Sequence, residues 1–298
     1  MAWPRSIFNL IVLCLLSGCF GVEDNPSLKS TGPALETISP VSKTPTSATT
    51  NTPFTLDITP VPTATSILPT PTTNLPAVMK AAKIMLFEDM IYDRYVKKAL
   101  DEAGYTYLDS GDGIGRLKEN ILSGTTWDLV IIASEGQYTV QGEFFDYIKM
   151  LLDQGSSVIT EMWILDWVKN GRIQPILEQC GISYQSNWVN PSNRDVYWVD
   201  PNHPLATEPN AVSLSHFRLY WRGDVGDLVM KVPGSPAQIV ASANAANSER
   251  DGLITVCYDG RLILQTFASH DHFQSEMVKL WQNYIYYALK TRILGSQK

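Results

Sequence analysis

Three short runs of consecutive apolar residues are the clearest hydrophobic pattern in the chain. They cover 84–87, 129–133 and 157–160. A run that is apolar throughout, rather than at alternate positions, is typical of a strand buried on both faces, as in a parallel sheet. Stretches with helical spacing of apolar residues separate the runs, with a short strand at 105–108. This alternation predicts an α/β fold, a doubly wound and mostly parallel sheet with helices on both faces. The expected helices cover 90–103, 114–122 and 143–153.

The C-terminal part predicts a β-hairpin and a closing helix. Two apolar runs flank Asp259-Gly260, a dipeptide that favours a tight turn between antiparallel strands. After them, apolar residues return at helical spacing, so the last helix should pack on the sheet. Asp271, with Gln274 three residues later, fits the start of that helix as a capping pair. The runs cover 253–258 and 261–267, and the helix covers about 271–291.

Residues 1–18 form a predicted secretory signal peptide. Arg5 supplies positive charge, and the apolar run that follows is shorter than the about 20 residues that span a bilayer. The tetrad at 16–19, Leu-Ser-Gly-Cys, resembles the lipobox of bacterial lipoproteins. This resemblance implies cleavage before Cys19, diacylation of its thiol and a lipidated N-terminus over 19–25. An ordinary signal peptide with an incidental Cys19 is the alternative.

Residues 26–77 are predicted to be a disordered tether. Thr, Pro and Ser make up 30 of these 52 residues, so the segment has no apolar face to bury and cannot offset its ordering entropy. The globular domain is expected over 78–298. Lipid chains anchor a protein stably when two or more are attached. We therefore expect a lipid-anchored protein on the extracytoplasmic face of a bacterial membrane, with the membrane as a partner.

Charge and cysteine content narrow the function. The chain has 23 Lys and Arg against 30 Asp and Glu, a net charge of −7, which does not supply the basic field of nucleic-acid binding. Cys14 would be lost with the signal peptide. Cys180 and Cys257 are interpreted as small buried apolar residues. A disulfide between those two outside the cell is the alternative.

The order of elements resembles the class I glutamine amidotransferase-like superfamily, including its ThuA-like branches. The resemblance implies a flavodoxin-like α/β domain, with a Cys nucleophile on a sharp turn after a central strand. In this chain the corresponding turn is Glu161-Met162-Trp163, which has no Cys. We therefore expect no glutaminase or cysteine-dependent hydrolase activity. The segments that carry the resemblance are 128–132, 151–155, 156–160, 200–205 and 260–265.

Candidate ligand-binding residues come from the expected strand ends and from the aromatic residues of the less regular second half. Ligands of open α/β sheets bind outside the carboxyl ends of the strands, and exposed rings can stack on sugars. Helix capping by the acids and burial of the rings in the core are the alternatives. The candidates are Glu88, Glu135, Glu161, Trp163, His203 and Trp221.

The segment 269–272, Ser-His-Asp-His, is where the resemblance would place a His/Glu catalytic pair. It differs from that pair in spacing and identity. Glu161, His270 and Asp271 are the candidate catalytic residues, because a carboxylate and an imidazole can exchange protons. His270 and His272 are the candidate metal ligands. No cofactor is predicted, a divalent metal being the alternative, and helix capping alone is the competing interpretation of the segment.

These features favour a non-catalytic domain that works as a binding or interaction module for a carbohydrate or an envelope protein. The alternative is a ThuA-like carbohydrate-active enzyme that uses Glu161 and the 270–272 segment. A purely structural role in the envelope is a third interpretation.

The lipobox can be tested directly. Cys19→Ala removes the thiol that would be acylated, so the protein should leave the membrane fraction and enter the medium or periplasm. Immunoblots of fractionated cells measure the distribution, and Cys14→Ala serves as the control because that residue would be cleaved away. Unchanged membrane retention of Cys19→Ala would contradict lipidation at this residue.

Overall fold

The structure, a computed structural model, describes residues 74–136, 140–214 and 221–295. The predicted signal peptide, Cys19, the 19–25 segment and the tether up to residue 73 lie outside these residues. The first helix, α1 (Leu75–Lys80), already includes Leu75, Pro76 and Ala77, which the sequence assigned to the tether. In the part of the chain that is described, no helix combines the length and the apolar character needed to cross a membrane.

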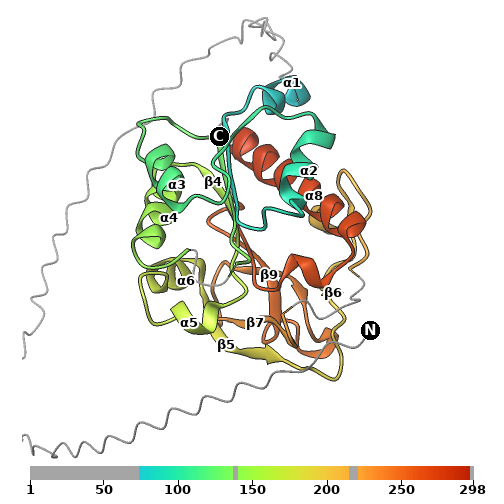
Figure 1. The fold of residues 1–298 in the computed structure, drawn as a ribbon. Helices are drawn as coiled ribbons and strands as arrows, with labels where there is room; N and C mark the ends of the chain where they lie inside the picture. The colour runs from blue at the N-terminus through green and yellow to red at the C-terminus, as the bar shows by residue number, and fades with distance from the viewer. Residues whose placement is uncertain (1–73, 137–139, 215–220, 296–298) are drawn as a thin grey trace, which may run out of the picture. The chain divides into compact units, whose positions relative to one another are not determined.

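One mixed sheet forms the centre of the domain (Figure 1). Along its main path the strands follow the order β2-β1-β3-β4-β10-β9-β7-β5, while β8 pairs with β9 and β6 with β8. The first five strands of this path are parallel, and β9 begins the antiparallel part. The strands are β1 (Ile84–Glu88), β2 (Tyr107–Asp109), β3 (Leu129–Ala133), β4 (Ser157–Glu161), β5 (Ile182–Val189), β6 (Tyr197–Trp198), β7 (Asp224–Lys231), β8 (Gln238–Ser242), β9 (Gly252–Cys257) and β10 (Leu262–Gln265).

Helices cover both faces of the sheet, as a doubly wound fold requires (Figure 1). Side chains of α1, α2 and α8 pack in one hydrophobic core, and those of α3, α4, α5 and α6 pack in the other. The predicted α/β fold, its hairpin and its closing helix are thereby confirmed. The remaining helices are α2 (Tyr95–Ala103), α3 (Ile114–Ile121), α4 (Glu143–Asp153), α5 (Leu165–Val168), α6 (Gln174–Cys180), α7 (Pro204–Thr207) and α8 (Gln274–Gly295), with 3₁₀ turns η1 (Ala245–Asn247) and η2 (Ser269–Asp271).

Two helices begin later than the sequence predicts. α2 starts at Tyr95 rather than near residue 90, because the buried Glu88 carboxylate accepts the amides of Val96 and Lys97 and so fixes the first turn. α8 starts at Gln274, so the prediction that Asp271 caps it is wrong. Asp271 instead lies in η2 and is 1% exposed.

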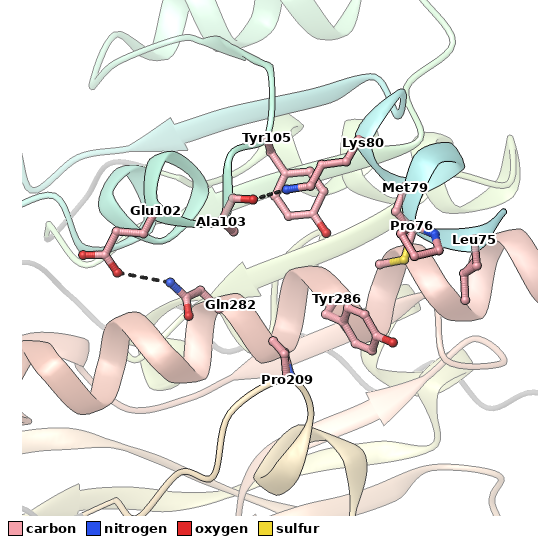
Figure 2. Close-up of a pocket in the computed structure, with 10 residues that line it drawn as sticks. All are labelled: Leu75, Pro76, Met79, Lys80, Glu102, Ala103, Tyr105, Pro209, Gln282 and Tyr286. Carbon is pink, nitrogen blue, oxygen red and sulfur yellow. Dashed lines mark hydrogen bonds between the residues drawn. The ribbon is translucent and has the colours of Figure 1, made fainter.

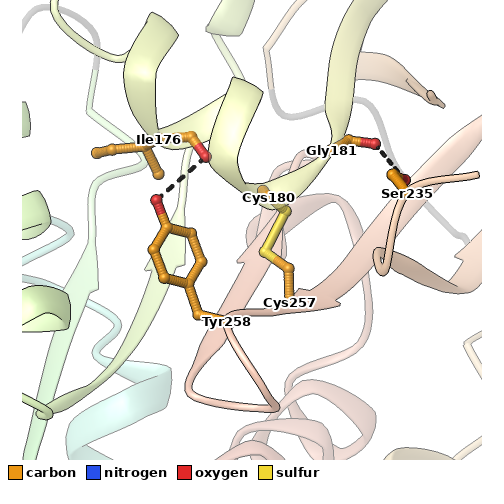
Figure 3. Close-up of a disulfide and its surroundings, with 6 residues drawn as sticks. All are labelled: Ile176, Cys180, Gly181, Ser235, Cys257 and Tyr258. Carbon is orange, nitrogen blue, oxygen red and sulfur yellow. Dashed lines mark hydrogen bonds between the residues drawn. A yellow bond between two sulfur atoms is a disulfide. The ribbon is translucent and has the colours of Figure 1, made fainter. Parts of the chain in front are cut away.

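A disulfide joins the two cysteines of the described domain (Figure 3). Cys180 ends α6 and Cys257 ends β9, and their sulfur atoms are bonded. Both cysteines are buried in the core, as predicted, and they form the disulfide that was the alternative interpretation. The bond fastens α6 to the antiparallel half of the sheet, beside the contact between Tyr258 and the Ile176 carbonyl.

Removal of this disulfide should lower stability without changing the fold. The bond closes a loop of 77 residues, so Cys180→Ser with Cys257→Ser should reduce the free energy of unfolding by about 2–4 kcal/mol. Urea denaturation followed by circular dichroism measures the change. The wild type under reducing conditions should move to the same midpoint, and equal midpoints for oxidised wild type and double variant would contradict the assigned role.

Candidate functional site

The carboxyl edge of the parallel sheet carries a row of polar residues in register. Glu88 of β1 pairs with Ala133 of β3, which pairs with Glu161 of β4, and Glu161 pairs with Gln265 of β10. Residues directly opposite one another on neighbouring strands point to the same face of a sheet. The preceding residues on this face, such as Ile131 and Ile159, belong to the core beneath α2 and α8. The carboxyl groups of Glu88 and Glu161 therefore lie where this hydrophobic face of the sheet ends.

Glu161 is the most deeply buried acid of this row, at 1% exposure. Its Oε1 accepts the amide of Ser269 at 2.7 Å and the side-chain amide of Gln265 at 3.2 Å. Gln265 in turn accepts the hydroxyl of Tyr284 at 3.0 Å, so the row is tied to α8. Burial, and next the negative charge of Glu135, raise the pKa of Glu161 well above its ordinary value. Burial therefore disfavours the charged form of this carboxyl group.

Glu135 and His270 form a buried pair above this row. Glu135 Oε2 lies 2.5 Å from His270 Nδ1, and the two side chains are 2% and 3% exposed. The other ring nitrogen, Nε2, donates to the carbonyl of Asp93 at 2.9 Å. Burial lowers the pKa of His270, but the hydrogen bond and charge of Glu135 outweigh it, and the net shift is upward. Acceptors at both ring nitrogens favour the charged form of His270.

Glu88 has a structural role at the start of α2. It accepts the amides of Val96 at 2.7 Å and Lys97 at 3.0 Å, and Arg94 donates to it at 3.2 Å. Arg94 also makes two hydrogen bonds to Asp109 at the end of β2. Burial raises the pKa of Glu88 to about 7, against the lowering effect of these donors. The carboxylate is directed to the helix rather than to solvent.

A small cavity lies between Glu88 and Glu161, since Ala133 between them has only a methyl group. Its volume is about 10 Å³, room for about one water molecule. Trp281 Nε1 lines it and, among the described residues, has no hydrogen-bond partner. His270 also lines this cavity, which places its side chain beside both acids.

An open cleft of about 360 Å³ lies over the same strand ends. Its walls are formed by the loop after β1 and by the residues just before β7. Aromatic, apolar and acidic side chains line it. The side chain of His270 lines this cleft and also borders the small cavity, so it connects the two spaces. Tyr92 is 98% exposed on the rim. The lining residues are Asp89, Met90, Ile91, Tyr92, Asp93, Trp221 and His270.

The structure brings together five of the six predicted ligand-binding residues but gives them different exposure. Trp221 lines the cleft and donates to Glu135 at 2.9 Å. Trp163 lies beneath it, stacked at 5.2 Å between ring centroids and 1% exposed, so it supports the cleft from below. Glu88, Glu135 and Glu161 are buried beneath the cleft. His203 precedes α7, accepts the amide of Leu205, and lies outside the cleft.

The two predicted metal ligands point into different surroundings. His270 bonds Glu135 and Asp93, whereas His272 is buried with its ring edge toward Phe267, 5.0 Å between centroids. Within residues 74–136, 140–214 and 221–295, no group of three or more His, Cys, Asp or Glu side chains is placed to hold a metal ion. A divalent metal at this segment thus has two histidines that do not converge.

Sequence reasoning missed the part of the site formed by the loop at 89–94. It assigned most of this segment to a helix, yet Asp89 accepts the amides of Glu135 and Gly136, each at 2.9 Å, and joins the two strand ends. Asp93 contributes a carbonyl to His270 and a carboxylate to Gln274. The concentration of Asp and Tyr after an apolar strand was the signal that could have indicated a loop.

No family model matches the chain, and no curated protein matches it. Solved structures with a similar backbone arrangement include a GMP synthase subunit protein from Thermoplasma acidophilum, with 10% identity and a TM-score of 0.45 over 72% of this chain and 98% of that one. A glutamine amidotransferase from Thermotoga maritima has 14% identity and a TM-score of 0.39, covering 62% and 75%. The glutaminase domain of Trypanosoma brucei CTPS has 8% identity and a TM-score of 0.38, covering 70% and 94%.

The two central acids should respond differently to the loss of charge. Because burial disfavours the charged form of Glu161, Glu161→Gln should change the free energy of unfolding by less than about 1 kcal/mol. Glu135→Gln removes one partner of a buried pair and should cost about 3 kcal/mol. Urea denaturation at neutral pH compares the two. Equal losses would contradict the different roles assigned to the two acids.

The pH profile checks the same assignment. Because the pKa of His270 is higher in the folded than in the unfolded protein, protonation of this residue stabilises the fold. This stabilisation is fully present below pH 6.5, the ordinary pKa of histidine, and is lost as the pH rises through the pKa of His270 in the folded protein. The difference between wild type and Glu135→Gln should therefore be largest in mild acid. In Glu135→Gln the NMR titration of His270 should move to lower pH.

Proposed function

We propose that this protein is a lipid-anchored protein of the extracytoplasmic membrane face, and that its amidotransferase-like domain binds a ligand, a carbohydrate, in the cleft over the carboxyl ends of β1 and β3. The observation that carries the proposal is the cleft itself. Aromatic and acidic side chains meet there, above acids whose hydrogen-bonding capacity is used inside the protein. Binding therefore requires no change in the buried network.

The chemistry of the cleft fits a neutral polyol. Flat faces of Tyr92 and Trp221 can pack against the C–H face of a sugar ring, and the carboxylates of Asp89 and Asp93 can accept hydrogen bonds from its hydroxyls. The volume of about 360 Å³ falls within the range of small-ligand sites. The location agrees with the general rule for open α/β sheets, because the strand order changes direction between β1 and β3.

The disulfide supports the extracytoplasmic location. Structural disulfides form and persist in oxidising compartments and are rare in the reducing cytosol. The bond between Cys180 and Cys257 also leaves no free thiol in the described residues, which supports a function without a cysteine nucleophile. The Glu161-Met162-Trp163 turn after β4 has no hydroxyl or thiol either.

A carbohydrate-active enzyme is the second candidate, and the position of His270 favours it. The His270 side chain borders the cleft on one side and the cavity with Glu161 on the other. A proton donor that lines a sugar-binding cleft has the position of a general acid. The Nε2 proton, which the Asp93 carbonyl accepts in the free protein, would pass to the substrate, and water would supply the proton that restores His270 after each reaction, while Glu135 stabilises the charged ring.

Binding can be measured on the mature, lipid-free chain with a panel of soluble polysaccharides by isothermal titration calorimetry. Tyr92→Ala and Trp221→Ala should each weaken binding at least about tenfold, which corresponds to about 1.4 kcal/mol. Tyr92 is 98% exposed, so its removal does not affect folding. Trp167→Ala is the matched control, because Trp167 is 47% exposed in α5 and does not line the cleft.

The outcome also distinguishes the two candidates. Binding that survives both cleft variants would contradict the proposed site. Chromatography of the incubated polysaccharide shows whether it is shortened. Intact polysaccharide supports the binding module, whereas products that disappear in Glu161→Gln while binding remains would favour the enzyme.

A further inference from the structure

A second, more apolar groove lies at the point where the N-terminal segment enters the domain (Figure 2). Its volume is about 330 Å³, and it lies between α1, the end of α2 and the middle of α8. Figure 2 shows side chains from all three helices around one space. It shares no lining residue with the cleft over the strand ends. The lining residues are Leu75, Pro76, Met79, Lys80, Glu102, Ala103, Tyr105, Pro209, Gln282 and Tyr286.

The groove has the composition of a surface that recognises proline-rich chains. Two tyrosines and two prolines form much of its wall, and aromatic-lined grooves bind polyproline II segments because these segments lose little entropy. The polar groups at its edge are already engaged. Lys80 Nζ donates to the Ala103 carbonyl and lies 4.1 Å from the centre of the Tyr105 ring, and Gln282 donates to Glu102 at 3.2 Å.

The chain itself supplies a matching segment next to the groove. Leu68-Pro69-Thr70-Pro71 precedes α1 by a few residues. Asn74 is the N-cap of α1 and accepts the amide of Ala77 at 3.3 Å. The segment therefore joins the domain at the start of α1. The six residues of 68–73 reach about 19 Å in the polyproline II conformation. α1 is only about 9 Å long, so the segment can turn back along it.

We propose that this groove binds the Leu68–Pro71 segment of the same chain in a polyproline II conformation. The short connection favours occupancy, because it gives the segment an effective concentration of order millimolar at the groove. A contact with a dissociation constant of about 0.1 mM would then be occupied about ten to one. The bound segment fixes the point and direction in which the tether leaves the domain.

NMR of the full chain in the presence of a soluble paramagnetic agent tests the proposal, with Cys19→Ser in place of lipidation and without the signal peptide. The side-chain protons of Leu68, Pro69 and Pro71 should be protected from the agent, with relaxation enhanced at least about threefold less than in an unstructured chain, because the groove covers these side chains. Tyr286→Ala and Leu68→Asp should each remove this protection. Leu68→Asp changes only the segment and cannot unfold the domain. Leu56→Asp, the same change farther up the tether, is the matched control and should leave protection intact.

Three results would overturn the proposal. The first is relaxation of these side-chain protons at the rate of an unstructured chain in the parent protein. The second is protection that survives both Leu68→Asp and Tyr286→Ala. The third is protection that disappears on about hundredfold dilution, because an occupant from a second copy depends on protein concentration and an internal one does not.

Discussion

The burial of carboxyl groups at the carboxyl edge of the sheet is the constraint on which the site depends. A carboxylate that loses water must be neutralised or supplied with donors. Glu161 obtains the amide of Ser269, and Glu135 obtains the amide and ring of His270. Both donors lie on η2, so the acids hold this turn in place and set where α8 begins. Glu88 fixes α2 in the same way. The acids thus determine the backbone around the cleft.

This arrangement divides the site into two layers with different properties. The lower layer is buried and polar, and it contains acids and a histidine that lie close to one another. The upper layer is the open cleft, whose rings and carboxylates are available to a ligand. Among the described residues, only His270 and Met90 line both spaces, and Met90 belongs to the loop after β1. A change of its charge would therefore be felt in the cleft through the Asp93 carbonyl, which bonds its ring.

The parallel core could be predicted because its strands are continuous apolar runs, and β3 has the predicted bounds. β1 and β4 each extend one residue further, to Glu88 and Glu161, because register rather than hydrophobicity places these acids in the sheet. The local sequence favoured Asp271 as the N-cap of the last helix. Hydrogen bonds from η2 to distant residues instead hold Asp271 in that turn, and α8 begins after it. The disulfide depended on the approach of residues 77 positions apart, which no local pattern encodes.

The position of β10 has a consequence for how the protein is made. This strand lies between β4, to which it is parallel, and β9, to which it is antiparallel, so it is the seam between the two halves of the sheet. Its pairing with β4 joins Gln265 to Glu161, 104 residues earlier. Until that later strand has been synthesised, the edge of β4 that it covers is unpaired. The long separation in sequence between the two strands therefore makes their pairing a slow step of folding, during which the exposed edge of β4 is prone to aggregation.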